Sequence, residues 1–96
     1  MPRAQISWKS IDAEGTRREV YAEHEGDRWL FFTRGGRYDL WQPLPAPSLE
    51  DWLELLDGVR RRIPRRWFRP EEEGRLKRLI LERYPKAELG NGSSKR

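Results

Sequence analysis

Three prolines at alternate positions divide this chain into two parts with different residue patterns. They lie in the segment Pro43-Leu44-Pro45-Ala46-Pro47. Proline has no backbone N–H, so these residues cannot donate hydrogen bonds to a β-ladder. We therefore expect an extended connector that leads the chain off a sheet, with strands before it and helices after it.

The part before the connector predicts an antiparallel meander of three or four strands over residues 5–42. Short runs rich in Val, Ile, Tyr, Phe and Trp alternate with turn-forming residues at regular spacing. Short loops favour antiparallel pairing of consecutive strands. A tight hairpin is expected at Gly35-Gly36, because both residues tolerate positive φ. The expected strands are residues 5–12, 16–24, 28–34 and 37–42.

Alternation along the first two strands predicts which side chains share a face of the sheet. Ile6 and Trp8 stand two residues apart in the first strand. In the second strand, Val20 and Ala22 alternate with Tyr21. Successive side chains of a strand point to opposite faces, so Tyr21 should lie on the face opposite Val20 and Ala22.

The third and fourth strands carry many of the aromatic residues. Residues 28–34 are apolar on both faces, as expected for a strand near the middle of a sheet. Trp29 should face the core, since its large ring buries much apolar area. In the fourth strand, Tyr38 and Leu40 would face one way and Trp41 the other.

A first helix is expected over residues 48–62. Ser48 stands where an N-cap is needed, and Asp51 follows three residues later in a capping-box pattern. The apolar positions follow helical spacing and include Trp52, which we assign to the core. The helix should end between Gly58 and Pro64. The acidic residues assigned to its polar face are Glu50, Asp51, Glu54 and Asp57.

A second helix is expected over residues 70–84. Pro70 suits a first turn, and the three glutamates that follow suit the positive end of the helix dipole. Pro85 should end the helix. The fold class predicted is therefore α+β, with the meander packed against both helices in a single domain of residues 1–88. A tail over residues 89–96 has a flexible composition. The buried stripe of this helix would be Leu76, Leu79, Ile80 and Tyr84.

Composition excludes several kinds of chemistry. The chain has 96 residues and no cysteine, so it can have no disulfide, no thiolate nucleophile and no Cys-based zinc site. Its N-terminal residues lack the apolar stretch of a signal peptide, and no run is long enough to span a bilayer. We therefore expect a cytoplasmic protein without a membrane partner.

The residues that could support catalysis are few. His24 is the single histidine, and we expect it to be a solvent-facing turn residue. A hydrolase built on His24 would need carboxylates to converge on it in one pocket. Gly35-Gly36 lacks the spacing of either phosphate-binding glycine motif. We therefore expect a small binding module without enzymatic activity, cofactor or metal.

The strongest functional signal is a run of arginines between the two expected helices. It places six guanidinium groups within ten residues, at Arg60, Arg61, Arg62, Arg65, Arg66 and Arg69. Guanidinium groups pair bidentately with phosphate oxygens, so the run predicts a nucleic-acid partner, DNA or RNA. Trp67 and Phe68 would anchor the segment to the core.

In an alternative interpretation, acidic residues of the same molecule neutralise part of the charge of the run. Residues 1–57 hold seven basic and eleven acidic residues, a net charge of −4, while residues 58–96 hold 13 basic and five acidic residues, a net charge of +8. The two parts attract each other. Residues 60–62 would also suit the negative end of the first helix. Three arginines, Arg65, Arg66 and Arg69, would then stay free to meet a partner.

A second candidate surface is a sheet face that carries arginines and an aromatic ring. Such a face can stack bases or follow a phosphate backbone. The alternative is that these arginines keep an edge strand soluble. The other candidate function is a protein-interaction adaptor with an acidic protein as partner. Oligomeric state stays open. The candidate residues of this face are Arg28, Arg34, Arg37 and Trp41.

Overall fold

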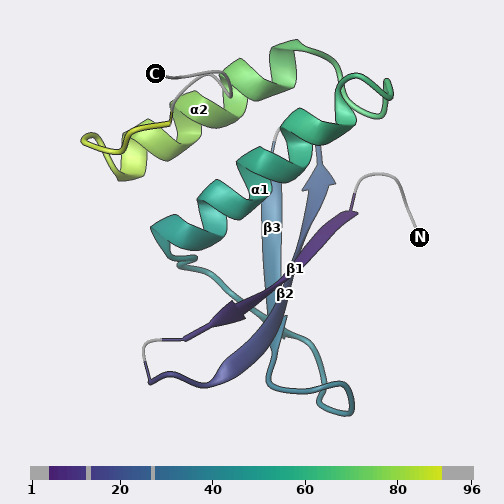
Figure 1. Ribbon diagram of the computed structural model, residues 1–96, viewed down its shortest axis with the longest axis vertical. Helices are drawn as coiled ribbons and strands as arrows, with labels where there is room; N and C mark the ends of the chain where they lie inside the picture. Colours follow the sequence, from purple (N-terminus) through teal and green to yellow (C-terminus); the bar gives the residue numbers. More distant parts are fainter. Residues whose placement is uncertain (1–4, 13, 27, 90–96) are drawn as a thin grey trace.

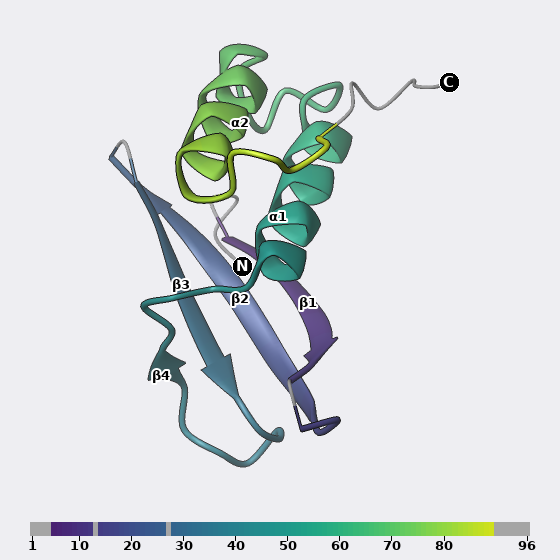
Figure 2. The ribbon, with the colours of Figure 1, turned by 90° about the vertical axis from the view of Figure 1, so that its left-hand side faces the viewer.

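The fold is α+β, with a four-stranded antiparallel sheet packed against two helices, as the sequence predicts. A computed structural model describes residues 5–12, 14–26 and 28–89 of the chain. Both helices lie on the same face of the sheet, and the opposite face is uncovered (Figure 1; Figure 2). The elements are β1 (Gln5–Ile11), β2 (Arg17–Glu25), β3 (Arg28–Arg34), β4 (Gln42–Pro43), α1 (Leu49–Arg62) and α2 (Glu71–Arg83), and the strand order is β1-β2-β3-β4.

The register of the sheet places the predicted core residues on the face below the helices. Ile6 pairs with Ala22, and Ala22 pairs with Phe31 on its other side. All three are buried, as are Val20 and Trp29. The alternation expected in the first two strands and the core position expected for Trp29 are therefore confirmed, because a shift of one residue would turn these side chains away from the core.

The fourth strand is much shorter than predicted. Residues 37–41 form no strand, and β4 consists of Gln42 and Pro43 alone. Tyr38 is 91% exposed and Leu40 is 81% exposed. Gly35-Gly36 therefore opens a wide loop instead of a tight hairpin, and the Asp39 N–H donates within that loop to the Gly36 carbonyl at 3.0 Å. No side chain of this loop packs in the core, so the alternation of residues 37–42 does not correspond to a buried and an exposed face.

The proline connector also takes part in the sheet, contrary to our expectation. Pro43 pairs with Phe32, and the Leu44 N–H donates to the Phe31 carbonyl at 2.8 Å. Pro43 is accommodated because β4 is an edge strand, where the missing N–H leaves no inner partner unsatisfied. One further hydrogen bond beyond β4 thus holds Leu44 to β3 before the chain crosses to α1.

α1 begins and ends where the sequence predicts. Ser48 and Asp51 form the complete capping box, and the helix stops at Arg62. Gly58 allows α1 to approach β1 closely, since a Cβ at this position would lie 2.7 Å from a methyl of Ile6. The buried face of α1 carries Trp52, Leu55, Leu56 and Val59.

α2 and the segment after it close the other side of the core. Leu76 and Ile80 are fully buried, while Leu79 and Tyr84 pack against them more peripherally. The Tyr84 hydroxyl donates to the Pro47 carbonyl at 3.1 Å, which ties the end of α2 to the connector. Leu89, which we assigned to the tail, packs against the core. The rest of that expected tail, residues 90–96, lies outside the described residues.

Candidate functional site

A buried carboxylate occupies the junction of α1 with the sheet. Asp51 is 0% exposed, so its assignment to a polar helix face is wrong. Its carboxylate accepts from Trp8 Nε1 at 3.1 Å and pairs with Arg18 Nη2 at 2.5 Å. It also accepts from the backbone N–H of Ser48. These partners occupy the carboxylate, and we assign it a structural role because buried charges must be paired.

We expected His24 to face solvent, and this expectation is wrong. Its imidazole lies against the indole of Trp29, with ring centroids 4.6 Å apart, and its side chain is 24% exposed. Its Nε2 lies 3.5 Å from Glu72 Oε2, and that oxygen accepts a hydrogen bond from Trp29 Nε1 at 3.2 Å. The alternation Val20, Ala22, His24 already placed this histidine on the core face. The neighbouring turn suggests exposure, but the alternation predicts the position of this side chain correctly.

A hollow of about 490 Å³ lies beside His24, between the end of β2 and the start of α2. We call it the interhelical hollow. Phe68 packs against the core there, as predicted, but Trp67 is 40% exposed and does not anchor the segment. Carboxylates do converge near His24, yet none of the described lining residues is a serine, threonine or cysteine. The lining residues are His24, Trp67, Phe68, Arg69, Glu71, Glu72 and Arg75.

Two arginines of the run hold the fold together. Arg60 donates from Nε to Glu73 Oε2 at 2.8 Å and from Nη2 to the Leu89 carbonyl at 2.9 Å. Arg62 donates to the Gly58 carbonyl at 3.1 Å, and its guanidinium carbon lies 5.7 Å from the centroid of the Trp67 ring. Arg60 is thus paired within the molecule, and its partner Glu73 belongs to residues 58–96, whereas the alternative interpretation expected acids of residues 1–57.

Positive charge is concentrated around Arg62. Burial lowers the pKa of its guanidinium, and the charges of Arg61 and Arg65 lower it further. Arginine stays charged at neutral pH despite such shifts. Three guanidinium groups near one another therefore create a positive potential at the C-terminal end of α1. The exposed ion pair of Arg61 with Asp57, at 3.2 Å, offsets little of it.

The segment after α1 is fixed by two backbone hydrogen bonds. The Arg66 N–H donates to the Ile63 carbonyl at 2.8 Å, and the Trp67 N–H donates to the Arg62 carbonyl at 3.1 Å. This pattern is a Schellman motif. Its left-handed position, which usually carries glycine, is held by Arg66 with a φ of 63°.

Three arginines of the run remain exposed on this fixed segment. Arg65, Arg66 and Arg69 are exposed, and within residues 5–12, 14–26 and 28–89 no carboxylate pairs with any of them. Because they share one short segment with the exposed Trp67, we treat them with Arg61 as one surface. We call these four residues, Arg61, Arg65, Arg66 and Arg69, the basic end.

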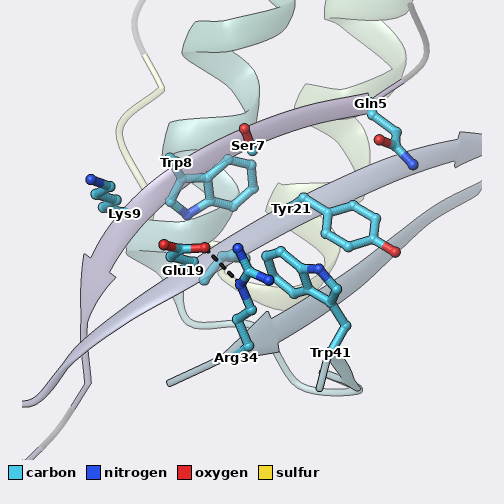
Figure 3. A pocket seen from close by; sticks show the side chains of 9 residues that line it. Gln5, Ser7, Trp8, Lys9, Glu19, Tyr21, Arg34 and Trp41 are labelled. Carbon is cyan, nitrogen blue, oxygen red and sulfur yellow. Dashed lines mark hydrogen bonds and ion pairs between the residues drawn. The ribbon is translucent and has the colours of Figure 1, made fainter. Parts of the chain in front are cut away.

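The uncovered sheet face carries an aromatic cluster with a second hollow, of about 630 Å³. Tyr21 stacks on Phe32 at a centroid distance of 4.9 Å and meets Trp41 edge-on at 4.7 Å. Arg34 lies over Trp41 at 4.5 Å while its Nε donates to Glu19 Oε1 at 2.8 Å (Figure 3). Burial, and then the charge of Glu23, raises the pKa of Tyr21. The guanidinium of Arg34 already contacts Glu19 and Trp41, so it is not open to a partner.

The four residues proposed for a sheet-face site are only partly brought together. Arg34 and Trp41 are in contact. Arg28 begins β3 and Arg34 ends it, about 20 Å apart by strand geometry. Arg37 lies in the loop 35–41, at the opposite end of the sheet from the basic end (Figure 1; Figure 2). Acidic residues on the same face, among them Glu19 and Glu23, make it a poor path for a phosphate backbone.

Two kinds of feature were sought among the described residues: clusters of metal-ligating side chains and helices that could span a membrane. In the part of the chain that the structure describes, no group of three or more His, Cys, Asp or Glu side chains could hold a metal ion. The described helices include none that is long and apolar enough to cross a membrane.

Comparison with family models, with curated proteins and with solved structures finds no match for this chain.

Proposed function

We propose that this protein is a binding module that holds nucleic acid through the basic end. The observation that carries the proposal is the exposure of Arg65, Arg66 and Arg69 on one segment, with no carboxylate paired to them among the described residues. Guanidinium groups in this state can form bidentate hydrogen bonds with phosphates. Burial is the main cause of the lowered pKa of Arg62, but the further lowering by the charges of Arg61 and Arg65 supports the proposal, because it reflects a positive potential that would attract a polyanion.

The conformation of Arg66 gives independent support. A non-glycine residue in the left-handed region costs about 1–2 kcal/mol. Glycine would close the same Schellman motif without that cost. Local strain that is tolerated at one position is typical of functional sites. Arg66 therefore fits a role in which its charge matters more than local stability.

Binding of a fluorescent oligonucleotide, followed by anisotropy over a series of salt concentrations, tests the proposal. Four phosphate contacts predict a slope of about −2.8 in log K against log salt for single strands. Affinity should then fall about 50-fold between 50 and 200 mM salt. Undetectable binding at low salt, or a flat salt dependence, would sink the proposal.

A matched pair of variants separates the basic end from general positive charge. Replacing all four of its arginines by glutamine should abolish most of the salt-dependent affinity. The control variant carries the same number of charge-removing substitutions at exposed sites elsewhere and should keep most of that affinity. Equal losses in the two variants would show that net charge alone attracts the oligonucleotide. The control positions are Arg17, Arg37, Arg78 and Lys86.

An acidic protein is the competing partner for the same surface. Poly-glutamate of matched length presents carboxylates, which accept hydrogen bonds from arginine, but it has no nucleobases. If poly-glutamate binds as tightly as the oligonucleotide and with the same salt slope, the basic end is a general polyanion site. The protein-interaction adaptor would then be the better description.

A further inference from the structure

We infer that the basic end selects single strands, with one unpaired base stacked on Trp67 inside the interhelical hollow. This inference rests on the proposed function and adds the form of the nucleic acid. Trp67 lies between Arg66 and Arg69 in sequence and lines the hollow together with Arg69. The same few residues thus offer a ring for a base and cations for the phosphates on either side of it.

The hollow has the size and lining that such a base requires. Its volume of about 490 Å³ falls within the range of small-molecule sites. Its walls combine aromatic surface from Trp67 and Phe68 with charged groups from Arg69, Arg75 and Glu72. Single-stranded bases are recognised by stacking on such rings and by hydrogen bonds to their exposed edges. A base within a duplex can offer neither its face nor its pairing edge.

The indole of Trp67 is held for this contact. The Arg62 guanidinium lies over the ring at 5.7 Å, and Arg62 is not among the residues that line the hollow. Trp67 thus contacts Arg62 and also borders the hollow. The Schellman motif fixes the backbone N–H of Trp67. A preordered ring loses less entropy on binding than a mobile one.

The electrostatic arrangement fits a single nucleotide strand better than a broad duplex surface. The arginines of the basic end belong to one turn and one short segment, so they reach only a few consecutive phosphates. Acidic side chains flank the hollow on its α2 side, at Glu71 and Glu72. Base edges that are exposed in a single strand can donate hydrogen bonds to these carboxylates.

The test compares the intact protein with two variants on three probes of identical length. The probes are a single-stranded DNA, the corresponding duplex, and a single strand with abasic sites, which keeps the phosphates and removes the bases. Wild type should bind the single strand at least about tenfold more tightly than either of the other probes. Trp67→Leu should lose about tenfold or more on the single strand alone. Trp67→Phe, which keeps a ring, should recover most of that loss.

Two readouts distinguish stacking from charge and from unfolding. Trp67→Leu should leave the salt slope unchanged, because no cation is removed, whereas Arg69→Gln should reduce the slope by about 0.7. Trp67 is 40% exposed, so the melting temperature of Trp67→Leu should stay close to that of the wild type. Binding should also quench tryptophan fluorescence in the wild type and much less in Trp67→Phe.

The failure of this inference differs from the failure of the proposed function. Equal affinity for single strand, duplex and abasic strand, with no effect of Trp67→Leu, would overturn the stacking inference and leave phosphate binding intact. Tighter binding of the duplex would also overturn it. No binding of any probe at low salt would overturn both.

Discussion

Replacing Arg66 by glycine should stabilise the fold while weakening the binding of nucleic acid. The φ of 63° at Arg66 costs an L side chain about 1–2 kcal/mol, and glycine removes that cost. Glycine also gains freedom in the unfolded chain, which offsets about 0.4–1 kcal/mol. Both backbone hydrogen bonds of the Schellman motif stay in place, because neither involves the side chain. The net stabilisation should be about 0.5–1 kcal/mol.

The stability arm of this prediction is measured by thermal and urea unfolding. For a domain of this size, 1 kcal/mol corresponds to about 4–8 °C in melting temperature, so Arg66→Gly should melt about 2–8 °C higher than the wild type. The urea midpoint should rise with an unchanged m-value. Arg65→Gly is the matched control, because Arg65 has no positive φ. That variant should lose stability, since glycine there adds only chain entropy.

The binding arm uses the oligonucleotide titration over salt. Arg66→Gly removes one cation of the basic end, so the salt slope should fall by about 0.7 for single strands. Arg66→Lys keeps a charge and should retain most of the slope without any gain in stability. A lower melting temperature for Arg66→Gly would refute the strain argument. A stabilised variant with an unchanged salt slope would refute the role of Arg66 in binding.

Three further substitutions test the packing and the ion pairs that hold the site in place. Asp51→Asn leaves the mostly buried guanidinium of Arg18 on β2 without its counterion and should destabilise the fold by about 3 kcal/mol in urea unfolding. Gly58→Ala should also destabilise the fold, by about 1–2 kcal/mol net, because the new Cβ would lie 2.7 Å from a methyl of Ile6. A stabilised variant would contradict the close approach of α1 to β1. A hydrogen bond from Arg60, ahead of the contribution of Lys77, lowers the pKa of Glu73, so this carboxylate contributes stability above its unfolded pKa of about 4.5 and loses it as pH falls through the lower folded value. Glu73→Gln should therefore be less stable than the wild type at pH 7, and the difference should vanish in unfolding experiments performed well below pH 4.

Elements with a local signal could be predicted from the sequence. The capping box at Ser48 and Asp51, the helical spacing of α1 and the alternation in β2 involve residues close together in the chain, so their patterns are visible without coordinates. The prediction of the fourth strand was wrong although its signal was also local. Alternation in residues 37–42 had the right period, but Tyr38 and Leu40 find no core to face and stay exposed.

The burial of polar side chains could not be predicted in this way. Asp51 is buried because Trp8 and Arg18, 43 and 33 residues earlier in the chain, donate to it. Glu72 is buried beside His24 and Trp29 for a similar reason. Charged residues are placed outside by default, and only distant partners reverse that default. The arginine run was predicted to divide into residues at the end of the first helix and exposed residues after it, and this prediction uses neighbouring residues alone. The ion pair of Arg60 with Glu73, by contrast, joins two helices and has no local signal.

Helical geometry explains why stability and binding can be tested separately in the arginine run. Neighbouring helix positions point about 100° apart, so consecutive arginines cannot all face the same surroundings. Arg60 therefore reaches Glu73 on α2, while Arg61 points to the exposed Asp57 one turn back on α1. Past Arg62 the left-handed turn at Arg66 changes the direction of the chain. Substitution of Arg60 or Arg62 would thus disturb the fold as well as any binding. Substitution at the basic end changes surface charge with little loss of packing, and a loss of affinity there can be assigned to contact with the partner.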